Sequence, residues 1–294
     1  MRSVNEVLPT PATDAGDARA PSGLVRALSD IVAEAGHRAR KMFHTGVKSW
    51  KKSGDSIVSD ADLAIDAFLH ERLAGFAPEL GWLSEETVDA PERLGRESLW
   101  VVDPIDGTRA FLAGDPDWAV SAALVARGRP IAAVLYAPIT DELFVASAGR
   151  GATRNGARIE VSAASSLAGA RLAGPRPMLD QLAAADNRFE RVPRIRSLAL
   201  RFARVAAGEI DAALASARSN DWDLAAADLL VHEAGGALTG FDGSPPRYNR
   251  PEPVHGPLVA AGHALHPDLL DVIARAMHPA EDFSSRAHGS PHHE

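Results

Sequence analysis

Two aspartates follow a short apolar run in the middle of the chain, and their setting allows two interpretations. The run Leu99–Val102 ends in Asp103 and Asp106, and a Gly-Thr pair comes next. The β-branched valines predict a buried strand that stops near Asp103, because Pro104 cannot continue a hydrogen-bonded ladder, and Gly107 allows a positive φ. Two carboxylates beside an apolar strand need a cation, a hydrogen-bond network or solvent. A divalent metal site is one interpretation, and an exposed turn is the other.

Two further acidic residues lie where apolar segments could bring them to the same place. Glu85 follows the short apolar run Gly81–Leu83, and Asp223 begins an alanine- and leucine-rich run that ends in a Gly-Gly pair. If the two strands are neighbours in one sheet, Glu85 would lie beside Asp103. The alternatives are that Glu85 begins a helix, and that Asp223 only complements the dipole of a helix.

These acids define the type of metal that the chain could hold. Glu85, Asp103, Asp106 and Asp223 would supply only oxygen ligands, and the sequence contains no cysteine. Oxygen ligands suit Mg²⁺ or Mn²⁺ rather than zinc. A hard cation beside a Gly-Thr turn suggests phosphate chemistry.

The elements that would position these residues follow from periodicity. Helices are predicted at residues 22–43, 60–75, 198–207, 222–234 and 266–277. Strands are predicted at residues 119–126, 131–136, 143–146, 159–161, 210–214, 237–239 and 257–261. In the helix at 60–75, the apolar residues define one face, and Asp62, Asp66 and Glu71 are expected to face outward. The middle of the chain is predicted to be an antiparallel meander, and residues 162–191 a weakly patterned crossover.

Composition restricts the class of protein. The chain has 294 residues, 46% hydrophobic residues and a net charge of −8. This balance predicts a globular protein and argues against extended contact with nucleic acid. No apolar run approaches the ~20 residues that span a bilayer, and residues 1–20 lack an apolar signal core, so we expect no membrane association and a cytoplasmic location. We predict disordered tails at 1–20 and 278–294, an N-terminal lobe at 21–161 and a C-terminal lobe at 162–277.

Three motifs together resemble those of the inositol monophosphatase superfamily. They are LSEE at residues 83–86, WVVDPIDGTRAF at residues 100–111 and WDLAAADLLVHEAGG at residues 222–236. Their order and spacing also agree, and the resemblance extends over residues 24–277. It implies an α/β fold, the layered α/β/α/β/α sandwich of the inositol monophosphatase and fructose-1,6-bisphosphatase type. It also implies a Mg²⁺-dependent, lithium-sensitive phosphatase, with Mn²⁺ as a possible substitute, and allows a homodimer.

The resemblance also implies roles for individual residues. Glu85, Asp103 and the carbonyl of Ile105 would hold one Mg²⁺, Asp103, Asp106 and Asp223 would hold a second, and a third ion would lie near Glu85. One metal would activate water for attack on phosphorus, and the other would stabilise the leaving alkoxide. Gly107 and Thr108 would bind phosphate, and the Thr108 hydroxyl would orient the water. In the family an acid partners this threonine, and here Ser56 stands at the matching position with Asp55 adjacent. Either residue could partner Thr108, so the proton route stays open.

The substrate is predicted from residues outside the motifs. Ser216 occupies the position of a glutamate that contacts sugar hydroxyls in inositol monophosphatases, whereas Leu200-Arg201-Phe202 resembles the Leu-Lys-Phe of bacterial 3′(2′),5′-bisphosphate nucleotidases. Arg201 would therefore bind a second phosphate, although an ordinary amphipathic-helix role is the alternative. Adenosine 3′,5′-bisphosphate is the predicted substrate and inositol 1-phosphate the alternative. Histidinol phosphate, suggested by Arg109, and a non-enzymatic role in RNA or transcription complexes are further alternatives.

Overall fold

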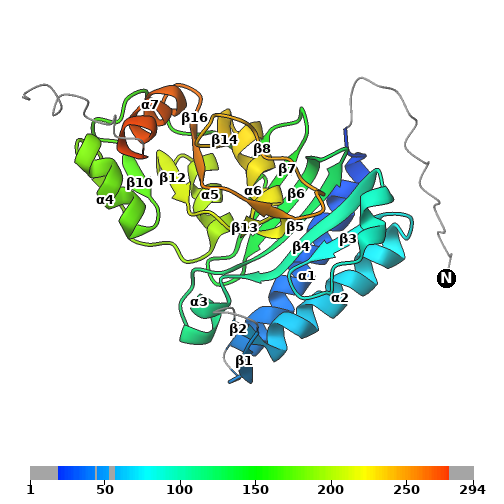
Figure 1. Cartoon of the computed structure of the whole chain (residues 1–294). Helices are drawn as coiled ribbons and strands as arrows, with labels where there is room; N and C mark the ends of the chain where they lie inside the picture. Colours follow the sequence, from blue (N-terminus) through cyan, green and yellow to red (C-terminus); the bar gives the residue numbers. More distant parts are fainter. Residues whose placement is uncertain (1–18, 44, 53–56, 278–294) are drawn as a thin grey trace, which may run out of the picture.

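Helices and sheets alternate in five layers over the residues that the computed structural model describes, which are 19–43, 45–52 and 57–277. Figure 1 shows the first and last of these layers at opposite ends of the molecule. The layers are α1 (Ser22–Phe43) with α2 (Asp60–Phe76), a first sheet, α5 (Leu198–Ala206) with α6 (Asp221–Glu233), a second sheet, and α4 (Arg176–Ala185) with α7 (His266–Met277). The predicted α/β/α/β/α sandwich is confirmed.

The first sheet places the strand of Asp103 and Asp106 next to an edge strand that ends one residue before Glu85. Its strands, in spatial order, are β3 (Gly81–Ser84), β4 (Ser98–Asp106), β5 (Ala119–Ala126), β6 (Arg129–Ala137), β7 (Glu142–Ser147), β8 (Ala152–Arg154) and β9 (Ala157–Ile159). The pair β3–β4 is parallel with Ser84 opposite Val102, and the strands that follow form the predicted antiparallel meander. The prediction that β4 stops near Asp103 is wrong, because a shift in register between Asp103 and Asp106 accommodates Pro104 within the strand.

The second sheet contains the shorter strands of the C-terminal half. Their spatial order is β11 (Glu190–Arg191), β10 (Arg171–Ala173), β12 (Ala212–Ala215), β16 (Leu258–Gly262) and β14 (Gly236–Gly240). Two small strand pairs complete the structure, β1 (Ser49–Lys51) with β2 (Ile57–Ser59), and β13 (Ser219–Asn220) with β15 (Val254–His255). Two short helices, η1 (Pro91–Gly95) and α3 (Thr108–Ala113), precede and follow β4. The predicted crossover at 162–191 contains β10, α4 and β11.

One central helix pair connects the two sheets. Helices α5 and α6 pack against both sheets, and their alanines, Ala225 to Ala227 among them, are fully buried. Small side chains allow both sheets to approach the helix pair closely, and a helix that is apolar on all sides is a core helix. One hydrophobic core extends across residue 162. The division into two lobes at that residue stays a prediction.

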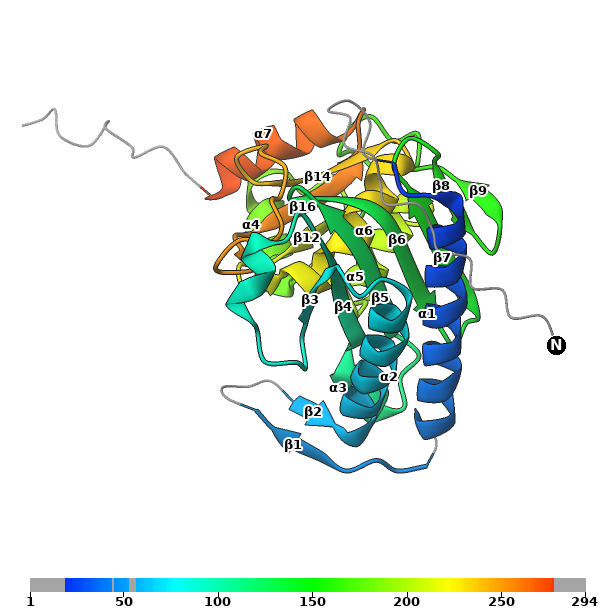
Figure 2. The ribbon, with the colours of Figure 1, turned by 90° about the vertical axis from the view of Figure 1, so that its right-hand side faces the viewer.

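Helix α2 differs from its prediction in the direction of two acids. Figure 2 shows α1 and α2 side by side in front of the first sheet. Asp62 and Asp66 are 0% and 7% exposed, so the prediction that they face outward is wrong, whereas Glu71 is exposed as expected. The two aspartates lie one turn apart on the face that packs on the sheet, where they accept hydrogen bonds from hydroxyl groups.

The described residues include no helix with the length and apolar character needed to cross a bilayer. Of the tails predicted at residues 1–20 and 278–294, only residues 19 and 20 belong to the described part of the chain, and Ala20 is buried.

Candidate metal and phosphate site

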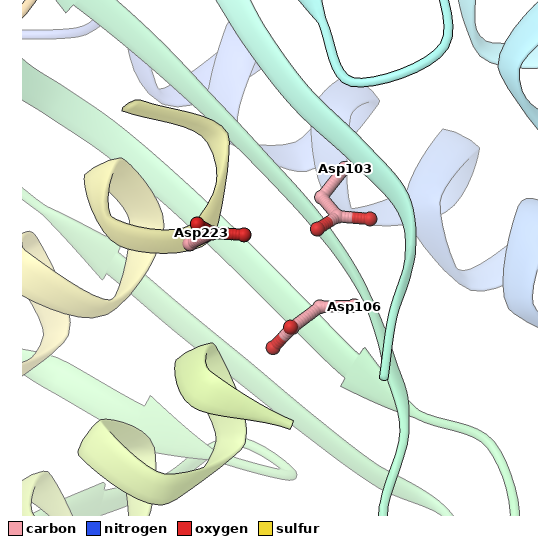
Figure 3. A group of neighbouring side chains, drawn as sticks. All are labelled: Asp103, Asp106 and Asp223. Atoms are coloured by element: carbon pink, nitrogen blue, oxygen red, sulfur yellow. The ribbon is translucent and has the colours of Figure 1, made fainter. Parts of the chain in front are cut away.

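Three aspartates from two layers converge at the end of β4. Asp103 and Asp106 lie on the strand, and Asp223 approaches from the first turn of α6 (Figure 3). One carboxylate oxygen of each lies within 4.8 Å of the others. The exposed-turn alternative for Asp103 and Asp106 is wrong, since the two side chains are 1% and 6% exposed.

Glu85 joins this cluster from the neighbouring strand. Its backbone N–H donates to the carbonyl of Val102 (3.3 Å), which continues the parallel pairing of β3 with β4 by one residue. Glu85 and the three aspartates line the same pocket. The prediction that two neighbouring strands bring Glu85 to Asp103 is confirmed, and the alternative that Glu85 begins a helix is not.

The donor set fits a hard divalent cation. Asp103 Oδ1 accepts the N–H of Ile105 (3.0 Å), whereas Asp103 Oδ2 is buried with no hydrogen-bond partner. An unpartnered buried carboxylate oxygen is costly unless a cation or proton satisfies it. All four side chains offer oxygen, which is the ligand atom that Mg²⁺ and Mn²⁺ prefer.

Asp106 is held by the start of α5 as well as by its own strand. Its Oδ2 accepts the Ser197 hydroxyl and the N–H of Ala199 (2.7 Å), and its Oδ1 accepts the N–H of Leu198 (3.3 Å). The N-terminus of a helix favours an anion there. Ser197 was not predicted from the sequence. Its signal was a serine directly before a predicted helix, in the position of an N-cap.

Asp223 has a local partner at the start of its own helix. It is the third residue of α6, and its Oδ2 accepts the N–H of Asn220, the N-cap (2.7 Å). This is the capping-box geometry, so the helix start itself orients the carboxylate. The dipole-partner interpretation and the metal-ligand interpretation therefore describe the same side chain.

Burial and mutual repulsion oppose ionisation of the cluster. The pKa of Asp103 lies well above its usual range because of burial first and the Glu85 charge second. The pKa of Glu85 is raised well above its usual range by burial and by Asp223. Burial together with the Asp106 charge raises the pKa of Asp223 to about 7. Burial raises the pKa of Asp106 despite its hydrogen bond from Ser197.

These shifts predict the pH dependence of stability without metal. A carboxyl with a raised pKa in the folded state holds its proton more tightly when folded than when unfolded, so stability falls as the pH rises between the two pKa values. For Asp223 that interval runs from 3.8 to about 7. In EDTA, the melting temperature is expected to fall by several degrees between about pH 4 and 7, and an excess of Mg²⁺ should remove most of this fall. Thermal unfolding at fixed ionic strength measures both slopes, and a metal-free protein that gains stability over this interval would contradict the prediction.

The partner of Thr108 comes from α2. The Thr108 hydroxyl donates to Asp62 Oδ1 (2.9 Å), and Asp62 Oδ2 accepts both the N–H (2.8 Å) and the hydroxyl (2.5 Å) of Ser59. Residues 55 and 56, where the partner was expected, lie outside the described residues. The sequence signal for Asp62 was the spacing Ser59-x-x-Asp62, which is a capping box at the start of α2.

Asp66 stabilises the loop that carries Glu85. It accepts the hydroxyl of Ser84 through Oδ1 and the hydroxyl of Thr87 through Oδ2 (2.6 Å). Two hydroxyls on either side of Glu85 are thus fixed to one buried carboxylate. Lys52 forms an ion pair with Glu86, the residue that follows Glu85.

The carboxylates lie at a pocket of about 240 Å³ that is also lined by arginine side chains. Its lining comprises Ile57, Glu85, Asp103, Asp106, Gly107, Thr108, Arg109, Arg194, Arg196 and Asp223. Gly107 has φ +101°, as predicted, and a Cβ there would come within 2.8 Å of the carbonyl oxygen of Asp117. Only glycine therefore fits this position without strain.

Arg201 lies elsewhere, and its surroundings show why. Its side chain is nearly buried, and its guanidinium donates to the carbonyl oxygens of Ile195 (2.7 Å) and Leu214 (3.0 Å). These acceptors satisfy the buried guanidinium, which does not line the pocket. Contact between Arg201 and substrate stays a prediction. Ser216, the other residue of that argument, is exposed after β12.

Comparison with known proteins agrees with this geometry. The model of the inositol monophosphatase family matches residues 20–279. Nus factor SuhB of Escherichia coli (strain K12) is 34% identical over 221 residues, which cover 71% of this chain and 82% of that protein. Inositol monophosphatase 2 of Solanum lycopersicum is 34% identical over 232 residues, which cover 73% of this chain and 88% of that protein.

Solved structures show the same fold. The Thermotoga maritima IMPase superposes with a TM-score of 0.77 at 27% identity, covering 87% of this chain and 98% of that one. SuhB from Bartonella henselae superposes with a TM-score of 0.75 at 28% identity, covering 86% and 98%. With the family match over most of its length and the carboxylate cluster at the positions of the three motifs, the chain belongs to the inositol monophosphatase family.

Proposed function

We propose that this protein is a Mg²⁺-dependent phosphomonoesterase that hydrolyses a small phosphorylated metabolite. The observation that carries the proposal is the cluster of Asp103, Asp106 and Asp223 with a buried carboxylate oxygen that has no protein partner. A site that pays for such an oxygen in the folded state gains most when a cation binds it. Family membership supports the same reaction class.

The residues divide into those that hold cations and those that handle the proton. Glu85, Asp103, Asp106 and Asp223 would hold the cations, which supply a water of lowered pKa and neutralise charge on phosphate. The Thr108 hydroxyl donates a hydrogen bond to Asp62, so the lone pairs of its oxygen are available to accept a hydrogen bond from water. In this role Thr108 orients the water and Asp62 receives its proton through the threonine. Lithium sensitivity is part of the same proposal.

The cations of the pocket favour a substrate with a second anionic group. Arg194 and Arg196 are exposed on the segment before α5, and the carbonyl of Ile195 between them is held by Arg201. Arg196 lies 3.3 Å from a carboxylate oxygen of Asp115. Guanidinium groups bind phosphate by paired hydrogen bonds. We infer that adenosine 3′,5′-bisphosphate is the preferred substrate, with Arg194 and Arg196 on its second phosphate.

Inositol 1-phosphate is the second candidate, because relatives of this chain are named for that activity. Inositol-1-monophosphatase of Mesorhizobium japonicum is 33% identical over 238 residues. An uncharged polyol would make less use of the two arginines, and the exposed Ser216 offers no carboxylate for its hydroxyls.

Alanine at Arg194 or Arg196 separates the two substrates. Each substitution is expected to raise KM for adenosine 3′,5′-bisphosphate about 10-fold, since one charge-assisted hydrogen bond is worth about 1.5 kcal/mol or more, and to change KM for inositol 1-phosphate by less than about 3-fold. Phosphate release from both compounds and from histidinol phosphate measures this. Arg176→Ala, an exposed arginine on α4, is the control. Equal losses on both substrates, or faster turnover of the polyol by the unaltered protein, would overturn the assignment.

A further inference from the structure

Arg93 is a buried cation outside the pocket lining. It is 3% exposed and lies on η1, eight residues after Glu85. Its guanidinium donates to both carboxylate oxygens of Asp89 (2.5 and 2.8 Å), to Asn249 Oδ1 (2.8 Å) and to the carbonyl of Arg250 (3.0 Å). The loop that follows Glu85 is therefore fixed to a segment more than 150 residues away in the sequence.

The same distant segment holds the first residue of α6. Asp221 is completely buried, and its carboxylate accepts the N–H of Asn249 (2.8 Å) and lies 2.7 Å from His255 Nε2. The backbone N–H of Asp221 donates to the carbonyl of Pro253 (2.9 Å), and β13 pairs with β15 directly before the helix. The beginning of α6 is thus anchored to residues 249–255 by side chain and backbone.

These contacts form a continuous link between two metal-binding positions. Glu85 lies at one end, where Arg93 holds its loop, and Asp223 lies at the other end, two residues after Asp221. Asn249 connects the two halves, because its side chain accepts from Arg93 while its N–H donates to Asp221. Glu85 comes from the edge strand of the first sheet and Asp223 from the middle helix layer, so neither element by itself sets their separation.

We propose that Arg93, Asn249 and Asp221 are positioning residues that set the geometry of the divalent-cation site by fixing Glu85 relative to Asp223. The proposal rests on the proposed function only in requiring that these carboxylates bind cations. The reason is geometric. Glu85 and Asp223 line one pocket from two different layers, and like charges there repel each other unless the elements that carry them are held together. Residues that orient ligands in this way strengthen metal affinity about 10- to 100-fold.

Direct Mn²⁺ binding to the full chain tests the link independently of turnover. Arg93→Lys keeps the charge but cannot reach all the acceptors of the planar guanidinium. Asn249→Gly removes the side-chain acceptor and suits the left-handed backbone at this residue (φ +57°). Both variants are expected to weaken Mn²⁺ binding, followed by electron paramagnetic resonance, about 10-fold. His255→Ala should have a similar effect, and His255→Gln, which retains a donor, should restore affinity to within about 3-fold.

Arg204→Lys provides the matched control. Arg204 donates to both carboxylate oxygens of Glu142 and joins α5 to β7, with both side chains largely buried, but it does not line the pocket. This variant should lower the melting temperature as much as Arg93→Lys and leave Mn²⁺ affinity unchanged. Unaltered affinity in Arg93→Lys and Asn249→Gly, or an equal loss in Arg204→Lys, overturns the inference. A protein that binds Mn²⁺ with the expected differences but releases no phosphate overturns the proposed function instead.

Discussion

Substitution of Asp103 by Asn is expected to lower the rate of phosphate-ester hydrolysis by about 10³-fold or more. Asp103 is central to the carboxylate cluster and supplies the buried oxygen that has no protein partner. Under the proposed function Asp103 holds a cation, and loss of that ligand removes several kcal/mol of transition-state stabilisation; about 4 kcal/mol corresponds to about 10³-fold in rate. Phosphate release at saturating Mg²⁺ measures the effect.

The same substitution should have the opposite effect on stability without metal. An amide at residue 103 carries no charge and can donate to the neighbouring carboxylates, so an unsatisfied and repelled group disappears. Its relief is worth about 1–3 kcal/mol, which corresponds to several degrees in melting temperature. Addition of Mg²⁺ should then stabilise the variant less than the unaltered protein. Lower metal-free stability of Asp103→Asn would contradict this account.

A buried aspartate on α6 outside the cluster serves as the control. Asp228 is 3% exposed and accepts the hydroxyl of Tyr248 (3.0 Å). Asp228→Asn keeps an acceptor for Tyr248, so we expect the rate and the Mg²⁺-induced stabilisation to stay close to those of the unaltered protein. Comparing the two variants also tests the alternative of a non-enzymatic role. A cellular phenotype that survives Asp103→Asn would not depend on hydrolysis.

The second large effect is expected at the pair Thr108 and Asp62. Thr108→Val removes the hydroxyl with little change in shape, and Asp62→Asn removes the group that accepts its proton. A proton transfer by a positioned group contributes about 10²–10⁴-fold, so each variant should lower kcat by about 10²-fold or more with little change in KM. Because the two residues act as one unit, the double variant should lose little more than either single one.

Two variants separate this role from the structural role of Asp62. Ser59→Ala removes a donor to Asp62 Oδ2 at the start of α2 but leaves the contact between Asp62 and Thr108. It should lower stability by about 1 kcal/mol, as the loss of a helix cap does, and keep kcat within about 3-fold. Thr108→Ser should retain most activity because it preserves the hydroxyl. A large loss of kcat in Ser59→Ala, or full activity in Thr108→Val, would contradict the proposed proton route.

The sequence by itself indicated the carboxylate cluster, and the resemblance of its motifs to a known superfamily predicted the layered fold. Each carboxylate of the cluster carries a local signal that does not depend on distant residues. Asp103 and Asp106 follow an apolar strand, Glu85 ends a second strand, and Asp223 lies in the first turn of a well-capped helix. Such signals survive in the chain because strand ends and helix caps are set by neighbouring residues. The resemblance of the three motifs to those of one superfamily then predicted that these carboxylates form one site.

Only the tertiary structure decided which hydrogen-bond partner each buried polar side chain has. Asp62 and Asp66 have the spacing of a solvated helix face, yet they are buried because α2 packs where Thr108 and Ser84 provide hydroxyl donors. Arg201 matches a substrate-binding pattern, yet its guanidinium donates to the carbonyls of a loop and of β12. A buried polar group must find a partner, and the partner can come from any element that packs against it. Local sequence therefore fixes where such a group lies along the chain, and the packing of distant elements fixes what it does.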